Sequence, residues 1–176
     1  AGILLLVVGV YRFARLWVDE RAASYAALFS AFIGVLSFLV YSAGQLPTTL
    51  SAALYFLALP YLYEWSRDGK ARSLLKGVVF TLVAAAVHHV TLIFGAPLLA
   101  IPVIWLACLD REEGSSIGGV ISRSAVFAVL AGLGVGLVLL PYWISIIQHP
   151  IEQVPIPHAS RSNLLMNATY LMNYFI

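Results

Sequence analysis

The uncharged stretch from Gly77 to Leu109 reads GVVFTLVAAAVHHVTLIFGAPLLAIPVIWLACL and holds two adjacent histidines near its middle. Counted from Leu74, the apolar run is about 36 residues long, and a single helix of that length would extend about 54 Å. The hydrocarbon core of a bilayer is only about 30 Å thick. We therefore expect a helical hairpin that turns at His88-His89, with one span over about 74–89 and the next over about 90–109.

A longer uncharged stretch lies upstream, from Ala22 to Tyr63. A span needs about 20 residues, so this stretch must also fold back once. The sequence Gly44-Gln45-Leu46-Pro47 marks the break, because glycine suits the end of one helix and proline suits the first turn of the next. With the flanking segments, the pattern predicts spans over about 1–11, 22–43, 46–63, 74–89, 90–109 and 124–147.

The composition supports a membrane protein and excludes several other classes. The 176 residues are 61% hydrophobic and only 10% charged, with a mean hydropathy of +0.93, which is far from the composition of a soluble or disordered chain. The single cysteine, Cys108, excludes a disulfide-stapled module, and a net charge of +2 is too sparse for a nucleic-acid surface. We predict an all-α, polytopic transmembrane helical bundle with about six spans. Because the chain starts at Ala1 and stops inside an apolar run, we expect it to be part of a larger protein.

The charged residues indicate an orientation. Three clusters, at 12–21, 64–76 and 110–123, contain nine of the ten Lys and Arg residues. The predicted spans place these clusters on one side of the membrane, and the positive-inside rule makes that side cytoplasmic. We expect an integral protein of a bacterial inner membrane, with all four histidines on the outer side.

The pair His88-His89 is the first candidate site. Imidazoles near the hydrocarbon boundary cost free energy unless they are solvated or hydrogen-bonded. They could contact a lipid phosphate, act as a general base or ligate a metal, or they could simply be interfacial residues of a hairpin tip, one facing water and one capping backbone groups. Since adjacent helical positions point about 100° apart and no acid or cysteine is near, we expect no metal site here.

An outer segment, 148–163, contains three prolines as well as His158 and Arg161. Arg161 could clamp a phosphate with the help of His158, or the segment could be an ordinary loop over the bundle. The following apolar segment, 164–176, fits either an interfacial helix or the start of another span.

A stripe of small residues on the last predicted span forms a small-xxx-small pattern, which allows another helix to approach closely. Its members are Ser124, Ala128, Gly132 and Gly136.

Two short motifs carry a family resemblance. The turn around Gly44 and Pro47, followed after a short span by His88 and His89, resembles the bacterial membrane proteins labelled 6-pyruvoyl-tetrahydropterin synthase-related. These proteins look like the GT-C class of polyprenyl-phosphate-dependent glycosyltransferases. This chain differs from their pattern in having Thr48 where members often carry an acid.

The resemblance implies an enzyme that uses a polyprenyl-phosphate-sugar donor at its outer face. It also implies a catalytic carboxylate in a first outer loop, which would lie upstream of Ala1, so that His88, His89, His158 and Arg161 would at most contact the lipid phosphate. The residues themselves leave a second class open, namely a non-catalytic accessory subunit that packs against other membrane subunits through the small-residue stripe. They identify no catalytic residue and no cofactor.

Overall fold

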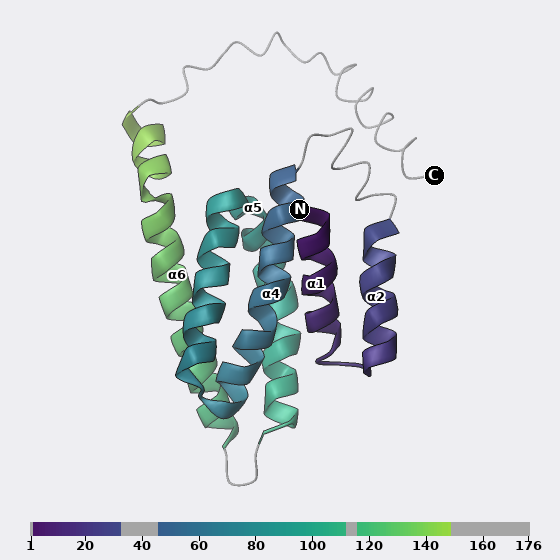
Figure 1. The fold of residues 1–176 in the computed structure, drawn as a ribbon. Helices are drawn as coiled ribbons and strands as arrows, with labels where there is room; N and C mark the ends of the chain where they lie inside the picture. The colour runs from purple at the N-terminus through teal and green to yellow at the C-terminus, as the bar shows by residue number, and fades with distance from the viewer. Residues whose placement is uncertain (1, 33–45, 112–115, 149–176) are drawn as a thin grey trace, which may run out of the picture. The chain divides into compact units, whose positions relative to one another are not determined.

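The computed structural model describes residues 2–32, 46–111 and 116–148, and every regular element in these ranges is an α-helix. The helices are α1 (Gly2–Ala14), α2 (Glu20–Phe32), α4 (Leu46–Asp68), α5 (Ala71–Leu109) and α6 (Ile117–Gln148), shown in Figure 1. The predicted all-α class is confirmed. Three described segments are long and apolar enough to cross a membrane: Leu46–Asp68, Ala71–Ile93 and Ile117–Ser145. The helices Gly2–Ala14 and Gly95–Leu109 are apolar but shorter.

The chain divides into two compact units at Leu140. The first unit holds α1, α2, α4, α5 and most of α6. Of the second unit, the structure describes only the last turns of α6, where the rings of Tyr142 and Trp143 lie 5.5 Å apart in an edge-on contact.

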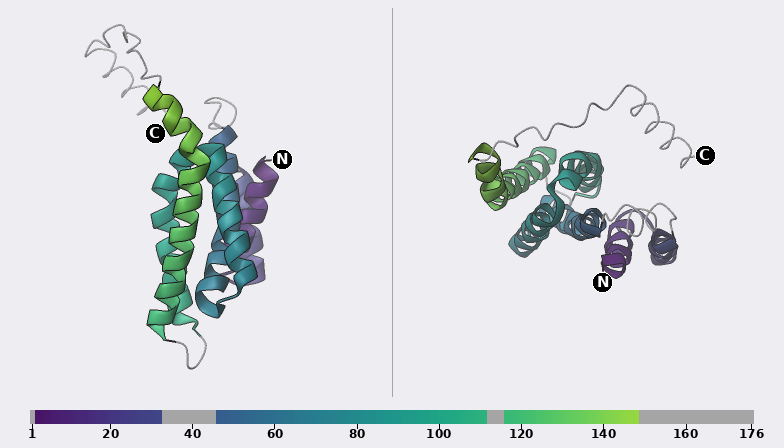
Figure 2. Two further views of the ribbon diagram at one scale, coloured as in Figure 1. Left: turned by 90° about the vertical axis from the view of Figure 1, so that its left-hand side faces the viewer. Right: turned by 90° about the horizontal axis from the view of Figure 1, so that it is seen from above.

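The long helix α5 reverses its direction near its middle, as Figures 1 and 2 show. The backbone leaves the helical region at His88, with φ −163° and ψ 90°. The reversal brings the end of α5 back beside its beginning, which follows directly on α4. A 2.9 Å hydrogen bond from Tyr63, near the end of α4, to Asp110, just after α5, shows this proximity. This geometry agrees with the turn expected at His88-His89.

Side chains of α4 bind the backbone around this reversal. The hydroxyl of Ser51, which is completely buried, shares its one proton between the carbonyl oxygens of Ala84 (2.8 Å) and His88 (3.1 Å). Eight residues beyond His88, the carbonyl of Ala96 accepts a 3.1 Å hydrogen bond from Tyr55. A carbonyl that leaves the helical ladder inside a membrane needs such a partner, since no water is present to replace it.

Helices α4 and α6 are both longer than the sequence predicted, and their ends explain why. Helix α4 continues past 63 to Asp68 and stops at Gly69, whose φ of +69° is in the left-handed region that favours glycine. Helix α6 begins seven residues before 124, because Ser116 caps it by accepting a 3.0 Å hydrogen bond from the amide of Gly119.

A further contact at the end of α4 comes from α6. Arg123 donates hydrogen bonds of 2.8 Å to the carbonyl oxygens of Ser66 and Arg67. These carbonyls belong to the last turn of α4 and have no partner within that helix, so Arg123 serves as a C-terminal cap supplied by another helix.

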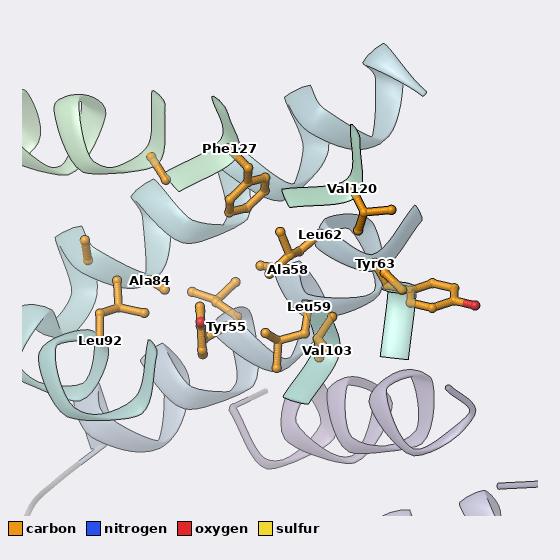
Figure 3. Packing of buried hydrophobic residues seen from close by; sticks show 14 of the residues in the cluster. Tyr55, Ala58, Leu59, Leu62, Tyr63, Ala84, Leu92, Val103, Val120 and Phe127 are labelled. Carbon is orange, nitrogen blue, oxygen red and sulfur yellow. The ribbon is translucent and has the colours of Figure 1, made fainter. Parts of the chain in front are cut away.

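The hydrophobic core lies between α4, both arms of α5, and α6 (Figure 3). Leu59 and Val103, from α4 and the second arm of α5, are almost completely buried, and Phe127 reaches the same cluster from α6. Figure 2 and the contacts between helices place α4 between α1 and α5. Helix α1 lies very close to α4 at Gly9, where a Cβ atom would be 2.8 Å from the carbonyl oxygen of Ala53.

Several predicted features lie outside the described residues. They are the break at Gly44-Gln45, the second half of the span 22–43, the segments 149–163 and 164–176, and with them His158 and Arg161.

The substitution Ser51→Ala tests the role of the α4 hydroxyl at the reversal. We expect it to lower the free energy of unfolding by about 1 kcal/mol, because a buried hydrogen bond from the Ser51 hydroxyl to the α5 backbone is lost in an apolar setting. Denaturation by sodium dodecyl sulfate in bicelles measures the loss. Ser24→Ala is the matched control, since Ser24 is exposed and bonds only one carbonyl of its own helix. Equal stability of Ser51→Ala and the control would contradict this role.

Candidate functional site

An open, apolar groove runs between the α5 hairpin and α6 and has a volume of about 400 Å³. Two buried residues of α4, Tyr55 and Leu62, form its floor. Along the helix Gly95–Leu109 the lining extends from Ala96 to Ile104, which corresponds to about 12 Å at 1.5 Å per residue. The groove therefore follows this arm of α5 over about two helical turns.

The lining is almost free of polar groups. Its polar side chains are His89, Thr81, Ser124 and the Tyr55 phenol, and the hydroxyls of Thr81, Ser124 and Tyr55 already bond within the protein. The remaining lining residues are Leu62, Leu92, Ile93, Ala96, Pro97, Ala100, Ile104, Phe127, Ala128, Ala131, Gly132, Val135 and Leu139. Such a surface suits a hydrocarbon chain or an apolar side chain and offers nothing to a polar ligand along its length.

The two histidines have different surroundings. The Nδ1 atom of His88 lies 2.8 Å from Thr91 Oγ1 in a hydrogen bond that closes the turn locally. His89 instead lines the groove, and its ring centroid is 6.4 Å from that of His88. The turn thus separates the pair into one residue that stabilises the reversal and one that contributes to the groove.

His89 is the only basic side chain in the described lining of the groove. It lies next to the reversal, far along the chain from Ile104 and Leu62 at the other end of the groove. A ligand with a long apolar part and one polar or anionic end would match this distribution. Among the described residues, no group of three or more His, Cys, Asp and Glu is arranged to hold a metal ion.

The charged residues at the opposite end of the bundle mainly bond one another. Arg67 pairs with Asp68 and donates a 2.9 Å hydrogen bond to Tyr63, which in turn donates to Asp110. Lys70 lies 2.6 Å from the Asp68 carboxylate, and this hydrogen bond raises the pKa of Lys70 above its ordinary value. These contacts join the end of α4 to both ends of α5, so we assign them a structural role.

The small-residue stripe on α6 is divided between two surroundings. Ser124 is buried and shares a 2.8 Å hydrogen bond with Ser66 of α4. Ala128 and Gly132 line the groove, and a Cβ atom added at Gly132 or Gly136 would meet nothing within 4 Å.

Within the chain, α6 packs through a neighbouring face. Its buried residues are Val120, Ser124, Phe127 and Ala131. Phe127 fits against Gly77 of α5, where a Cβ atom would lie 2.6 Å from the ring.

Sequence reasoning missed the groove and the two α4 residues that shape it, Ser51 and Tyr55. A signal was present, because polar side chains four residues apart on one face of an otherwise apolar span usually point into the protein. The groove itself leaves no such pattern, since its lining comes from three helices.

The chain was also compared with known proteins. No family model matches it, and no curated protein or solved structure is significantly similar to it.

Proposed function

We propose that this chain is embedded in a membrane, acts on a lipid-linked substrate and holds the lipid chain in the groove between α5 and α6. The observation that carries the proposal is the combination of a long apolar groove with a single histidine, His89, close to one end. A polyprenyl phosphate has the same division into a long hydrocarbon chain and one anionic end. Neutral or protonated, an imidazole can donate a hydrogen bond to that phosphate.

The activity that fits best is that of a GT-C-like glycosyltransferase, the class that the chain resembles at Gly44, Pro47, His88 and His89. In this activity the acceptor attacks the sugar carbon and the polyprenyl phosphate leaves. His89 would contact the phosphate as charge develops on it, and His88 would hold the turn. In an activity of this class, a carboxylate would be the base that activates the acceptor.

In a bacterial inner membrane, the chain would be oriented with its charged clusters in the cytoplasm. The clusters 12–21, 64–76 and 110–123 hold nine of the ten Lys and Arg residues. The second cluster includes the end of α4, and residues of the other two contact the last turns of that helix: Arg12 bonds Tyr61, Asp110 bonds Tyr63, and Arg123 bonds Ser66. The positive-inside rule would put this end in the cytoplasm, so the His89 end of the groove would face outward.

Cysteine labelling tests the orientation. In a Cys108→Ala background, we expect a membrane-impermeant maleimide added to intact cells to modify Leu46→Cys, which replaces an exposed residue at the start of α4. It should modify Lys70→Cys, at the exposed opposite end, only after the cells are permeabilised. The reverse pattern would refute the orientation.

The groove is tested by a pair of glycines on α6. Gly132 lines the groove, while Gly136, one turn further, does not, and both have open space at the Cβ position. We expect Gly132→Leu to reduce labelling of the full-length protein by a photoactivatable polyprenyl phosphate by at least about five-fold, because overfilling a fitted site costs about 1 kcal/mol or more. Gly136→Leu should label like the wild type. Equal labelling of all three proteins would overturn the groove assignment.

The substitutions Gly132→Leu and Gly136→Leu also test a second candidate function, that of a non-catalytic subunit in a membrane complex. The open space at Gly132 and Gly136 favours it, because small residues on an exposed helix face permit close packing of another helix. If α6 serves this purpose, both substitutions should release partner subunits during purification in mild detergent, and neither should alter polyprenyl phosphate labelling selectively.

A further inference from the structure

Tyr61 of α4 contacts two cationic side chains from different helices. Arg12 of α1 donates a 3.0 Å hydrogen bond to the Tyr61 hydroxyl, and its guanidinium carbon is 4.6 Å from the centre of the Tyr61 ring. Lys76 of α5 places its ammonium nitrogen 5.5 Å from the same ring centre. Phe80, one turn after Lys76, stacks on Tyr61 with the two rings nearly parallel and 5.9 Å apart.

This arrangement differs from the other charged contacts at the same end of the bundle. Arg67 and Lys70 share the carboxylate of Asp68. Within the described residues, by contrast, neither Arg12 nor Lys76 forms an ion pair with a carboxylate. Two cations held at one ring repel each other, and the negative face of the ring offsets only part of that repulsion. An anion between them would compensate both charges.

The position of the three residues indicates the kind of anion. Tyr61 lies two turns before the end of the candidate span Leu46–Asp68, and Arg12 is in the last turn of α1. Trp17, three residues after the end of α1, and Trp105, four residues before the end of α5, are both exposed, as tryptophans often are at the boundary between membrane and water. The two cations are therefore at the depth of lipid headgroups.

An apolar surface continues from this point toward the middle of α5. Val79 and Val83 follow Lys76 at helical spacing and are exposed. A lipid whose phosphate lies between Arg12 and Lys76 could place an acyl chain along these two residues. A free phosphate ion would leave that surface unused.

We propose that Arg12, Tyr61 and Lys76 form a binding site for the phosphate of an anionic phospholipid. Arg12 keeps further N–H groups for phosphate oxygens while one of them bonds Tyr61. Lys76 contributes a second positive charge from the facing helix. The site is independent of the groove between α5 and α6, because none of its three residues lines that groove.

The test is native mass spectrometry of the purified full-length protein with added phosphatidylglycerol, and with phosphatidylcholine as the zwitterionic comparison. We expect Lys76→Gln to weaken phosphatidylglycerol binding by about five-fold, since one basic residue near anionic lipid contributes about 1 kcal/mol. Binding of phosphatidylcholine should not change. Arg72→Gln is the matched control, because Arg72 is an exposed cation one turn earlier on α5.

Three results would overturn the proposal. One is unchanged phosphatidylglycerol binding by Lys76→Gln, and another is an equal loss in Arg72→Gln, which would indicate diffuse surface charge. The third is displacement of the lipid by inorganic phosphate at equal concentration, which would indicate a site for a free ion. Arg12→Gln adds a second measurement: phosphatidylglycerol should raise the melting temperature of the wild type but not that of this variant, whatever the variant's own stability.

Discussion

The constraint on which this fold depends is that backbone carbonyls inside a membrane need donors from the protein. At His88 the chain leaves the helical conformation between two apolar arms, and in a soluble protein water would bind the exposed groups. Here Ser51 binds two carbonyls on the first arm and Tyr55 binds one on the second. Because these hydroxyls are one turn apart on α4, that helix fixes both the position of the reversal and the separation of the arms.

The rest of the arrangement follows from that reversal. If α5 were one straight helix, its end would lie far from α4, and α6 would begin on the opposite side of the bundle. With the reversal, Asp110 reaches Tyr63, α6 starts beside the end of α4, and the second arm stands next to α6. The charged contacts therefore gather at one end, while an apolar groove remains between two helices that meet closely only at part of their length.

The sequence was sufficient for the helical class and for the reversal, because both depend on the length of uncharged runs and on where polar residues interrupt them. It was less informative about helix ends: the cap at Ser116 depends on one side-chain hydrogen bond, and the cap by Arg123 depends on two that come from another helix. It did not identify the face by which α6 packs within the chain. That helix has apolar residues on several faces, so the sequence alone does not show whether the face of Phe127 or the face of Gly132 is buried. The positions of the neighbouring helices decide which face is buried.

The cap at the end of α4 has a consequence for biosynthesis. Arg123 follows Ser66 by 57 residues, so α4 and the whole of α5 leave the ribosome before the donor for these carbonyls exists. Until α6 arrives, the last turn of α4 can be satisfied only by water at the membrane surface. The last turn of α4 is therefore completed only when α6 has packed against it. Truncation before α6 would leave α4 with a frayed end even if the α5 hairpin inserted correctly.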